Sequence, residues 1–457
     1  MNAQTRWKPS VFNNALPSQN GRTWFNSRSS CLFSLDDATS RILELVLTEI
    51  AEEGTCPNEE VGKKLSALGL IVPSTLDEYE TERIEFQRRL RSHDTLKVII
   101  APTMGCNLRC TYCFQQNLQK TKILDPAIQA GIVDLVRRLV PDVRLLIVQW
   151  FGGEPLLAWQ QIREMTSAFQ QICRDYDADY YAEMLTNGTL LTEDKIAEFD
   201  RLAIRAIQIP LDGSVATYAE RKQVQFERAL RFHEFIARNL QSIVDQTGSV
   251  TIRVNIDRDN PDGGKEVVRL IRAGNCTDQR VDFRLGFLNT SRGILDCIPH
   301  DCFSPMEFSE VENEFRRFLA AQGYRVYGQP ERRQYPCSAP TSNSFTVDPK
   351  GGIGKCVPSI GTAGSCFAQI YPGDVDRTLA EMSRADVPYS NFDPFLRGPC
   401  SGCSLLPACL GSCPKMHAVG AQFQCSMKPG LAERLSFYAD SPAERDVLTS
   451  SSSATVG

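Results

Sequence analysis

Between residues 96 and about 290, apolar and polar positions alternate between short strand-like runs and longer helix-like stretches. The strand-like runs are β-branched or apolar: KVIIAPT (97–103), LLIVQWF (145–151), YYAEMLT (180–186), AIQIPLD (206–212), VTIRVNI (250–256) and VDFRLGF (281–287). The amphipathic stretches between them have helical length and cover 125–140, 159–174, 192–202, 222–243 and 263–273. Six strands alternating with helices predict right-handed crossovers and a parallel α/β sheet, as an open sheet or a partial barrel.

Residues 1 to about 95 have a different pattern. WFNSRSSCLFSL (24–35) predicts a strand or a hairpin, and Asp36 or Asp37 can cap a helix that runs to about Glu52. A second helix, a short strand and a third helix are predicted at 58–68, 70–72 and 76–92. The third helix carries five acids and four bases, which indicates a solvent-facing surface.

The C-terminal third has little regular patterning. Residues 330–440 are irregular and rich in Gly, Pro and Cys, as expected where metal replaces a hydrophobic core. The last residues, SPAERDVLTSSSSATVG, have the composition of a flexible tail. We therefore expect an N-terminal domain, an α/β domain, a Cys-rich domain and a tail, over residues 1–95, 96–300, 301–440 and 441–457.

Composition narrows the function classes. Fifty Lys and Arg residues against 55 Asp and Glu residues give a net charge of −5, so no long-range positive field gathers nucleic acid. No apolar run approaches the roughly 18 residues of a membrane-spanning helix, and the start, MNAQTRWKPS, lacks the apolar core of a secretory signal. We expect a cytoplasmic protein that binds neither nucleic acid nor membrane. In that compartment the 17 cysteines do not form a disulfide framework, so they are core residues, redox catalysts or metal ligands.

Three cysteines directly follow the first strand of the alternating region. Cys106, Cys110 and Cys113 have the spacing C-x3-C-x2-C in APTMGCNLRCTYCFQQ. Thiolates at this spacing are costly to desolvate unless a cation neutralises them, which indicates metal. No fourth cysteine lies nearby, whereas a structural zinc site closes all four positions. A [4Fe–4S] cluster on three thiolates leaves one iron open, at the strand end where parallel sheets gather their chemistry.

Seven further cysteines lie late in the chain: Cys337, Cys356, Cys400, Cys403, Cys409, Cys413 and Cys425. Four of them have the spacing C-x2-C-x5-C-x3-C in PCSGCSLLPACLGSCP. Because the chain has only four histidines, mixed Cys/His zinc fingers are disfavoured. Zinc on four thiolates and iron–sulfur clusters both remain open for this late set.

CNLRCTYC, followed by FGGEP about 40 residues later, resembles the signature of the radical S-adenosylmethionine (radical SAM) superfamily. The late pattern resembles the SPASM extension of its peptide- and protein-modifying members: Cys337-x13-Gly351-x4-Cys356, then C-x2-C-x5-C-x3-C, then Cys425. The resemblance covers roughly residues 96–430. It implies a partial (β/α)6 TIM barrel followed by a Cys-rich SPASM domain.

The resemblance implies a mechanism. Cys106, Cys110 and Cys113 would hold a [4Fe–4S] cluster whose open iron binds the amino and carboxylate groups of S-adenosylmethionine. One electron, supplied by a donor such as flavodoxin or ferredoxin, would cleave the sulfonium C–S bond. The resulting 5′-deoxyadenosyl radical would take a hydrogen atom from an unactivated C–H of the substrate.

The resemblance also assigns contacts with S-adenosylmethionine near the C-terminal ends of the strands: Tyr112, Gly152, Gly153, Glu154, Thr186, Asn187, Gln208, Asp212, Arg221 and Asn255. The two glycines would let backbone approach the methionine amino group, and Glu154 would accept from its ammonium. Arg221 would neutralise the methionine carboxylate, unless it is a surface arginine that opens helix 222–243. Pro210 replaces the serine of the family's Q-x-S-x-D-G region.

For the late set, the resemblance implies two auxiliary clusters, which makes three [4Fe–4S] clusters in all. Cys400, Cys403, Cys409 and Cys425 would hold one cluster, and Cys337, Cys356 and Cys413 would hold the other. The fourth ligand of the second cluster stays open between Cys366, Cys302, Cys297 and an open iron. We expect the stretch Cys297–Cys302, with His300, to be structural and His417 to be a hydrogen-bonding neighbour of the clusters. Core positions are expected for Cys31, Cys56, Cys173 and Cys276.

The strand–helix–helix–strand–helix order of residues 1–95 resembles the winged-helix, RRE-like element that precedes many peptide-modifying radical SAM enzymes. Such an element captures a leader peptide as an added edge strand. A structural cap on the barrel would give the same pattern.

Taken together, the resemblance predicts a radical SAM/SPASM maturase of ribosomally synthesised and post-translationally modified peptides (RiPPs). It would bind a precursor peptide through its leader and install an oxidative modification, a thioether or carbon–carbon cross-link. One alternative is a maturase of the sulfatase-activating type, which oxidises Cys or Ser in a protein to formylglycine. A non-catalytic zinc scaffold is the other.

Overall fold

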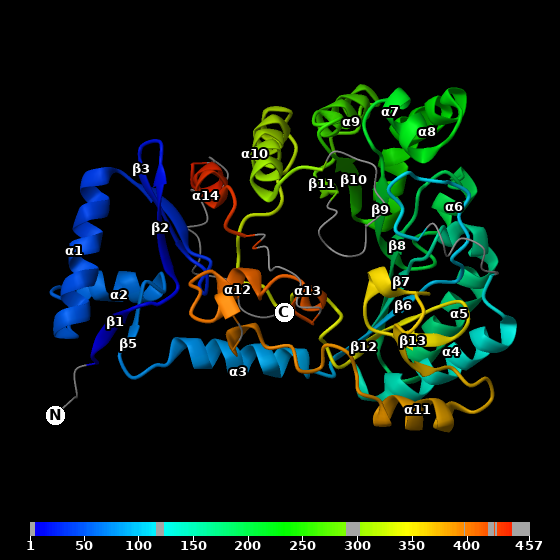
Figure 1. Ribbon diagram of the computed structural model, residues 1–457, viewed down its shortest axis with the longest axis horizontal. Helices are drawn as coiled ribbons and strands as arrows, with labels where there is room; N and C mark the ends of the chain where they lie inside the picture. The colour runs from blue at the N-terminus through cyan, green and yellow to red at the C-terminus, as the bar shows by residue number, and fades with distance from the viewer. Residues whose placement is uncertain are drawn as a thin grey trace.

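The computed structural model describes residues 5–115, 123–288, 302–396, 398–418, 425 and 427–440. Its N-terminal unit and its barrel lie at opposite sides of the molecule. The short helices α12 (Leu406–Cys409) and α13 (Pro414–Ala418) of the Cys-rich region lie between them (Figure 1). Helix α3 (Glu78–Leu90) runs from the N-terminal unit towards the barrel. No helix in these ranges is long and apolar enough to cross a membrane.

Six parallel strands form the centre of the largest sheet and match the six strands predicted from the sequence. They are β6 (Thr95–Ile100), β7 (Leu145–Trp150), β8 (Asp179–Leu185), β9 (Ile204–Pro210), β10 (Val250–Ile256) and β11 (Val281–Phe287). Each pairs in parallel with its neighbours in chain order. The predicted α/β fold with a partial TIM barrel is therefore confirmed.

The late part of the chain extends this sheet, which the sequence did not predict. Strand β12 (Ser344–Val347) pairs in parallel with β6, and β13 (Gly352–Gly354) and β14 (Cys366–Gln369) follow in antiparallel order. These strands are only three or four residues long, too short for an alternating apolar pattern to show. Their pairing means that part of the expected C-terminal domain is built onto the barrel.

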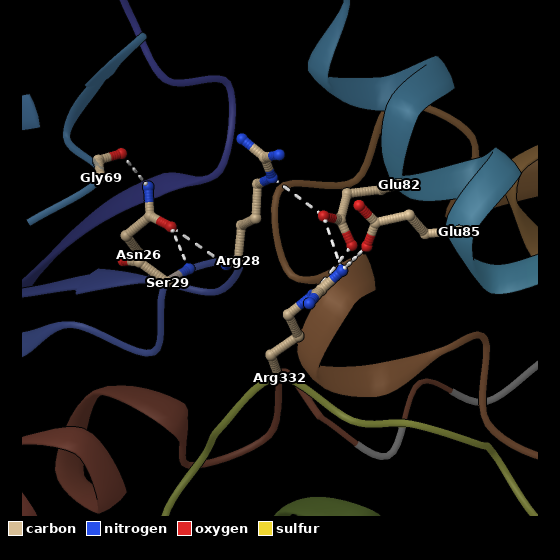
Figure 2. A pocket seen from close by; sticks show the side chains of 7 residues that line it. All are labelled: Asn26, Arg28, Ser29, Gly69, Glu82, Glu85 and Arg332. Atoms are coloured by element: carbon tan, nitrogen blue, oxygen red, sulfur yellow. Dashed lines mark hydrogen bonds and ion pairs between the residues drawn. The ribbon is translucent and has the colours of Figure 1, made fainter. Parts of the chain in front are cut away.

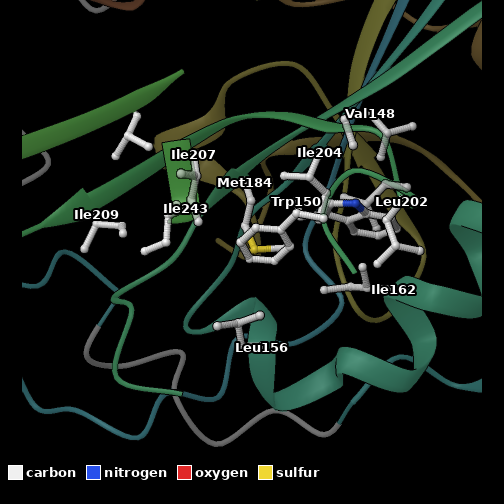
Figure 3. Packing of buried hydrophobic residues seen from close by; sticks show 14 of the residues in the cluster. Val148, Trp150, Leu156, Ile162, Met184, Leu202, Ile204, Ile207, Ile209 and Ile243 are labelled. Atoms are coloured by element: carbon white, nitrogen blue, oxygen red, sulfur yellow. The ribbon is translucent and has the colours of Figure 1, made fainter. Parts of the chain in front are cut away.

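Helices α4 (Pro126–Leu139), α5 (Trp159–Asp175), α8 (Phe226–Thr247) and α9 (Gly263–Ala273) alternate with the strands. Figure 3 shows strand residues such as Trp150, Met184 and Ile207 packed among Leu156, Ile162, Leu202 and Ile243. Trp150 is fully buried in this core. Burial of these apolar side chains stabilises the barrel that carries the cysteine loop.

The predicted helix 222–243 is wrong at its start. The structure has a separate helix, α7 (Val215–Lys222), and α8 begins only at Phe226. Gln223 ends α7 in the left-handed conformation, at φ +55°. The expected helix 192–202 is likewise reduced to α6 (Glu193–Ala197). Arg221 and Lys222 therefore lie at the C-terminal end of a short helix.

The N-terminal unit contains more strands than its sequence predicted. Antiparallel strands β2 (Asn13–Ser18), β3 (Gly21–Asn26) and β4 (Leu32–Leu35) form one sheet, and β1 (Trp7–Pro9) pairs with β5 (Ile71–Pro73). Helices α1 (Asp37–Glu53) and α2 (Glu59–Ala67) precede α3. Asp36 caps α1 as expected, through the backbone N–H of Thr39.

One face of this sheet packs against the Cys-rich region. Phe25 is fully buried beside Leu405, Ala408 and Leu435. Leu435 belongs to α14 (Leu431–Ala439), which lies beside the sheet (Figure 1). The opposite face packs on α1 and α2 through Trp24 and its neighbours. Both faces are therefore covered, while β2 and β4 each pair only with β3 among the described strands.

The prediction that α3 presents its charges to solvent is wrong for two of them, because Glu78 and Glu82 are 2% and 1% exposed. Figure 2 shows Glu82 between Arg28 and Arg332, where it accepts from both guanidinium groups. Both arginines come from distant parts of the chain, so local sequence could not reveal the pairing. Together with Asn26, Ser29, Gly69 and Glu85, these three residues line a pocket of ≈ 260 Å³.

We expect Glu82→Ala to lower the free energy of unfolding, because it leaves two arginines without their shared acid. The free energy of unfolding should fall by about 2–3 kcal/mol. This is less than for a fully buried ion pair, because Arg28 and Arg332 are partly exposed to solvent. Chemical denaturation followed by circular dichroism measures it. Glu80→Ala is the matched control: Glu80 is an exposed partner of Arg83 on the same helix, and its loss costs under about 0.5 kcal/mol. Equal effects of the two substitutions would contradict the assignment.

Candidate functional site

The cysteine loop, residues 101–115, leaves the end of β6 and packs against the turn after β7. Backbone N–H groups of Gly153 and Glu154 donate to the carbonyl oxygens of Thr103 and Gly105, at 3.1 and 2.9 Å. A Cβ atom on Gly152 would clash with Thr103 O, and one on Gly153 would clash with Gly105 O. Both glycines are therefore required for the close approach of two loops, a reason that sequence analysis did not find.

The three cysteines of this loop are partly buried neighbours. Burial raises the pKa of Cys106 and Cys110, and charge on Cys113 raises that of Cys106 further. Charge on Cys106 in turn raises the pKa of Cys110. Such thiols lose their protons when a metal binds them, because a bound cation offsets the cost of the buried negative charge.

In the parts of the chain that the structure describes, no three His, Cys, Asp or Glu side chains converge closely enough to hold one metal ion. A tetrahedral zinc site needs its ligands around a single ion. In an iron–sulfur cluster each thiolate binds a different iron, so the thiolates stand further apart. The donor set itself, three thiols on one loop, fits an iron–sulfur cluster that leaves one iron open.

Asn187 connects the cysteine loop to the end of β8. Its Nδ2 donates to Cys106 Sγ at 3.7 Å and to Asn107 Oδ1 at 2.9 Å. Thr186, the residue before it, donates through its backbone N–H to the carbonyl of Gln208 on β9 at 3.1 Å. The structure thus brings these predicted residues together at the C-terminal ends of neighbouring strands.

Glu154 was expected to accept a hydrogen bond from the ammonium of the cofactor. In the structure its side chain is fully buried. Its carboxylate accepts from the backbone N–H groups of Leu156 and Asn187 and from Thr186 Oγ1, at 2.7–2.9 Å. Burial raises its pKa to about 7. In this structure Glu154 positions Asn187, while direct contact with a cofactor ammonium would need an exposed oxygen.

A buried polar network lies beside the cysteine loop. Lys222 Nζ forms an ion pair with Asp212 Oδ2 at 2.7 Å and donates to Tyr112 Oη, which itself donates to Asp212. Asn255 Nδ2 lies 3.2 Å from both Tyr112 Oη and Asp212 Oδ1. Burial disfavours both charges, but their mutual attraction lowers the pKa of Asp212 and holds that of Lys222 well above its usual range.

Sequence analysis selected Tyr112, Asp212 and Asn255 but missed Lys222. A lysine at the end of an amphipathic stretch is normally a surface residue, and only its spacing of four from buried Tyr218 hints otherwise. Tyr112 was expected to contact S-adenosylmethionine, and in the structure its side chain enters this network.

One of the two predictions for Arg221, a surface arginine, is wrong, because the residue is only 4% exposed. It forms an ion pair with Asp257 and donates to the carbonyl oxygen of Asn255 at 3.0 Å. Asp257, one residue after β10, is an acid that sequence analysis did not select. In this structure Arg221 therefore joins α7 to the end of β10.

Four late cysteines line one cavity of ≈ 200 Å³: Cys400, Cys403, Cys409 and Cys425. Burial raises the pKa of Cys400 to about 11, and charges on the other three raise it as well. Sequence analysis assigned the same four residues to one auxiliary cluster. Their donor set and shared cavity fit such a group.

Cys337, Cys356 and Cys413 form a third group. Burial raises the pKa of Cys337 to about 11, and charges on Cys413 and Cys356 act on it in the same direction. Burial raises the pKa of Tyr389 to about 12, and charges on the same three thiols raise it as well.

One of the candidates for the open fourth ligand is Cys366. It is on β14, and its thiol donates to Asp348 Oδ2 at 3.8 Å. Cys297 and His300 lie outside the described residues, and Cys302 is partly buried. His417 Nε2 lies 2.7 Å from the carbonyl oxygen of Gly411, so it is a hydrogen-bonding neighbour as expected. Cys173 and Cys276 are buried core residues, while Cys31 and Cys56 are only partly buried.

We expect the stability contribution of Glu154 to fall as pH rises from about 5 to about 8. Because its pKa is raised in the folded chain, the native state keeps a proton that the unfolded state has already lost. Denaturation midpoints of the wild type and Glu154→Gln, measured across this range, test the sign. A wild-type advantage that grows with pH would contradict it.

Comparison with known proteins places this site in context. Residues 100–276 match the model of the radical SAM superfamily. The radical SAM cyclopropyl synthase TigE of Paramaledivibacter caminithermalis is 20% identical over 82% of this chain and 80% of its own length.

Two solved structures share the fold. Streptococcus suis SuiB bound to precursor peptide SuiA has a TM-score of 0.50 at 15% identity, over 89% of this chain and 95% of its own. The enzyme anSMEcpe with bound AdoMet and the Cp18Cys peptide has a TM-score of 0.54 at 16% identity, over 78% of this chain and 99% of its own.

Proposed function

We propose that this chain, which carries a radical SAM domain over residues 100–276, is a peptide maturase that installs an oxidative modification in a ribosomally synthesised precursor. The observation that carries the proposal is the presence of three separate cysteine groups in one chain, at the end of β6, in the ≈ 200 Å³ cavity and around Tyr389. The peptides in two similar solved structures, SuiA with SuiB and Cp18Cys with anSMEcpe, support a peptide or protein substrate.

We assign Cys106, Cys110 and Cys113 as ligands of a [4Fe–4S] cluster with one open iron. When bound there with S-adenosylmethionine, the cluster supplies a 5′-deoxyadenosyl radical that removes hydrogen from substrate. The chain itself fixes the loop: Gly152 and Gly153 allow the turn after β7 to approach it, and Asn187 donates to Cys106 Sγ. Ala101 and Met104 of the loop are buried in an apolar cluster with Ile99, which anchors the start of the loop on the barrel.

The remaining cofactor contacts are proposed at the same ends of the strands: Tyr112, Glu154, Thr186, Gln208, Asp212, Arg221 and Asn255. Most of these side chains are buried and already bonded to one another, so we assign them chiefly to fixing the walls of the site. The two late cysteine groups would each hold an auxiliary [4Fe–4S] cluster in a SPASM domain over residues 301–440. A flavodoxin or ferredoxin is the proposed electron donor.

Residues 1–95 are proposed as an RRE-like, leader-binding domain. A three-stranded antiparallel sheet followed by α1, α2 and α3 supports this role. Because both faces of the sheet are covered, a peptide can add only along an edge, at β2 or β4. A structural cap is the alternative for this unit, and it would bind no peptide.

A sulfatase-activating type of maturase is the second candidate, supported by the match with anSMEcpe. The matched region covers 99% of the anSMEcpe chain but only 78% of this one, so about a fifth of this chain has no counterpart in anSMEcpe. SuiB accounts for 89% of this chain. The difference favours a peptide maturase with an additional substrate-binding unit.

Simultaneous substitution of Cys106, Cys110 and Cys113 by Ala is expected to abolish formation of 5′-deoxyadenosine, because the open-iron cluster loses all its ligands. Anaerobic reconstitution with dithionite, followed by chromatography, measures the product. Iron content should fall by about four atoms per chain, while the auxiliary iron stays. Full S-adenosylmethionine cleavage in this variant would disprove the assignment.

The substrate class is tested by co-expression with a short peptide encoded beside this gene. We expect mass spectrometry to find the loss of a pair of hydrogens for each cross-link formed in the core of the peptide. A peptide without its leader should remain unmodified. Conversion of one Cys or Ser to an aldehyde that reacts with hydrazide, independent of any leader, would instead support the sulfatase-activating type.

A further inference from the structure

The C-terminal end of α7 binds the middle of the cysteine loop. Carbonyl groups in the last turn of a helix lack partners within that helix. Here the carbonyl oxygen of Arg221 accepts from the backbone N–H of Thr111 at 2.9 Å, and that of Lys222 accepts from Arg109 at 3.4 Å. Thr111 and Arg109 are the two neighbours of Cys110, so α7 fixes this cysteine from both sides.

The side chain of Lys222 turns back to the same loop. It is 2% exposed, and its Nζ lies 4.9 Å from the ring centre of Tyr112 and 5.5 Å from that of Tyr218. It also donates to Tyr112 Oη. A buried ammonium is costly unless it is paired and hydrogen-bonded, and this one is held by Asp212, Tyr112 and two aromatic rings.

The charge of Lys222 lies against the cysteine loop. Its Nζ contacts both the hydroxyl and the ring of Tyr112, which stands between Cys110 and Cys113 on that loop. No sequence pattern or relative described above assigns such a role to Lys222.

We propose that Lys222 is a positioning residue that holds the cysteine loop and places a fixed positive charge beside Tyr112, between Cys110 and Cys113, which raises the reduction potential of the cluster bound by the loop. Reduction adds negative charge to the cluster, and a nearby cation stabilises the more negative state. The inference depends on the radical SAM centre and on no property of the peptide substrate.

The test is a redox titration of full-length, reconstituted protein, followed by electron paramagnetic resonance. The signal that changes on addition of S-adenosylmethionine identifies the centre among several clusters. We expect Lys222→Met to shift its midpoint to a more negative potential and Lys222→Arg, which keeps the charge, to restore most of the wild-type value.

Lys97→Met is the matched control, because Lys97 also pairs with an acid, Glu183, at 2.8 Å, but sits inside β6 and away from the cysteine loop. It removes the same charge from the chain and should leave the midpoint unchanged. A shift of equal size in this control would show a general charge effect and overturn the proposal.

Lys222→Met leaves Asp212 buried without its cation, which destabilises the fold. The double variant Lys222→Met/Asp212→Asn removes both charges and should show a smaller negative shift, because the negative charge of Asp212 is lost as well. A wild-type midpoint in both variants, with normal iron content, would overturn the proposal. If the peptide proves unmodified while the midpoint shifts, only the proposed substrate fails.

Discussion

The cysteine loop after β6 is held in place from two directions by backbone hydrogen bonds, and the rest of the site depends on this. The turn after β7 donates to Thr103 and Gly105, while the end of α7 accepts from Arg109 and Thr111. Backbone contacts of this kind fix the chain more firmly than flexible side chains, because few rotatable bonds are involved. They define where three thiols stand relative to the mouth of the barrel, and therefore where a cofactor with an open coordination site can bind.

Sequence patterns predicted the barrel because its strands are β-branched runs whose burial on both faces leaves little ambiguity. The short strands β12, β13 and β14 were not predicted, because three or four residues carry no usable period. The separate helix α7 was not predicted, because the helical pattern continues across Gln223, whose backbone is left-handed in the structure. Local conformational strain of this sort depends on tertiary contacts, which the order of residues does not display.

The candidate site divides in the same way. The resemblance to the SPASM extension grouped the late cysteines, and Cys400 lines one cavity with the three cysteines of its group. Charged residues were harder, because their partners are distant in the chain: Glu82 meets Arg332, and Lys222 meets Asp212. The sequence pattern selected Glu154 but did not show that its side chain is fully buried. A family pattern can group cysteines that are close in the sequence, whereas the partners of a buried ion pair are visible only in the folded structure.

The central claim is that Cys106, Cys110 and Cys113 hold a cluster whose remaining iron binds S-adenosylmethionine. Electron–nuclear double resonance on the reduced full-length protein, with the cofactor labelled with 15N at its amino group, addresses this directly. The account predicts a hyperfine coupling between the cluster spin and the labelled nitrogen. A spectrum without that coupling, unchanged when the cofactor is added, would contradict it.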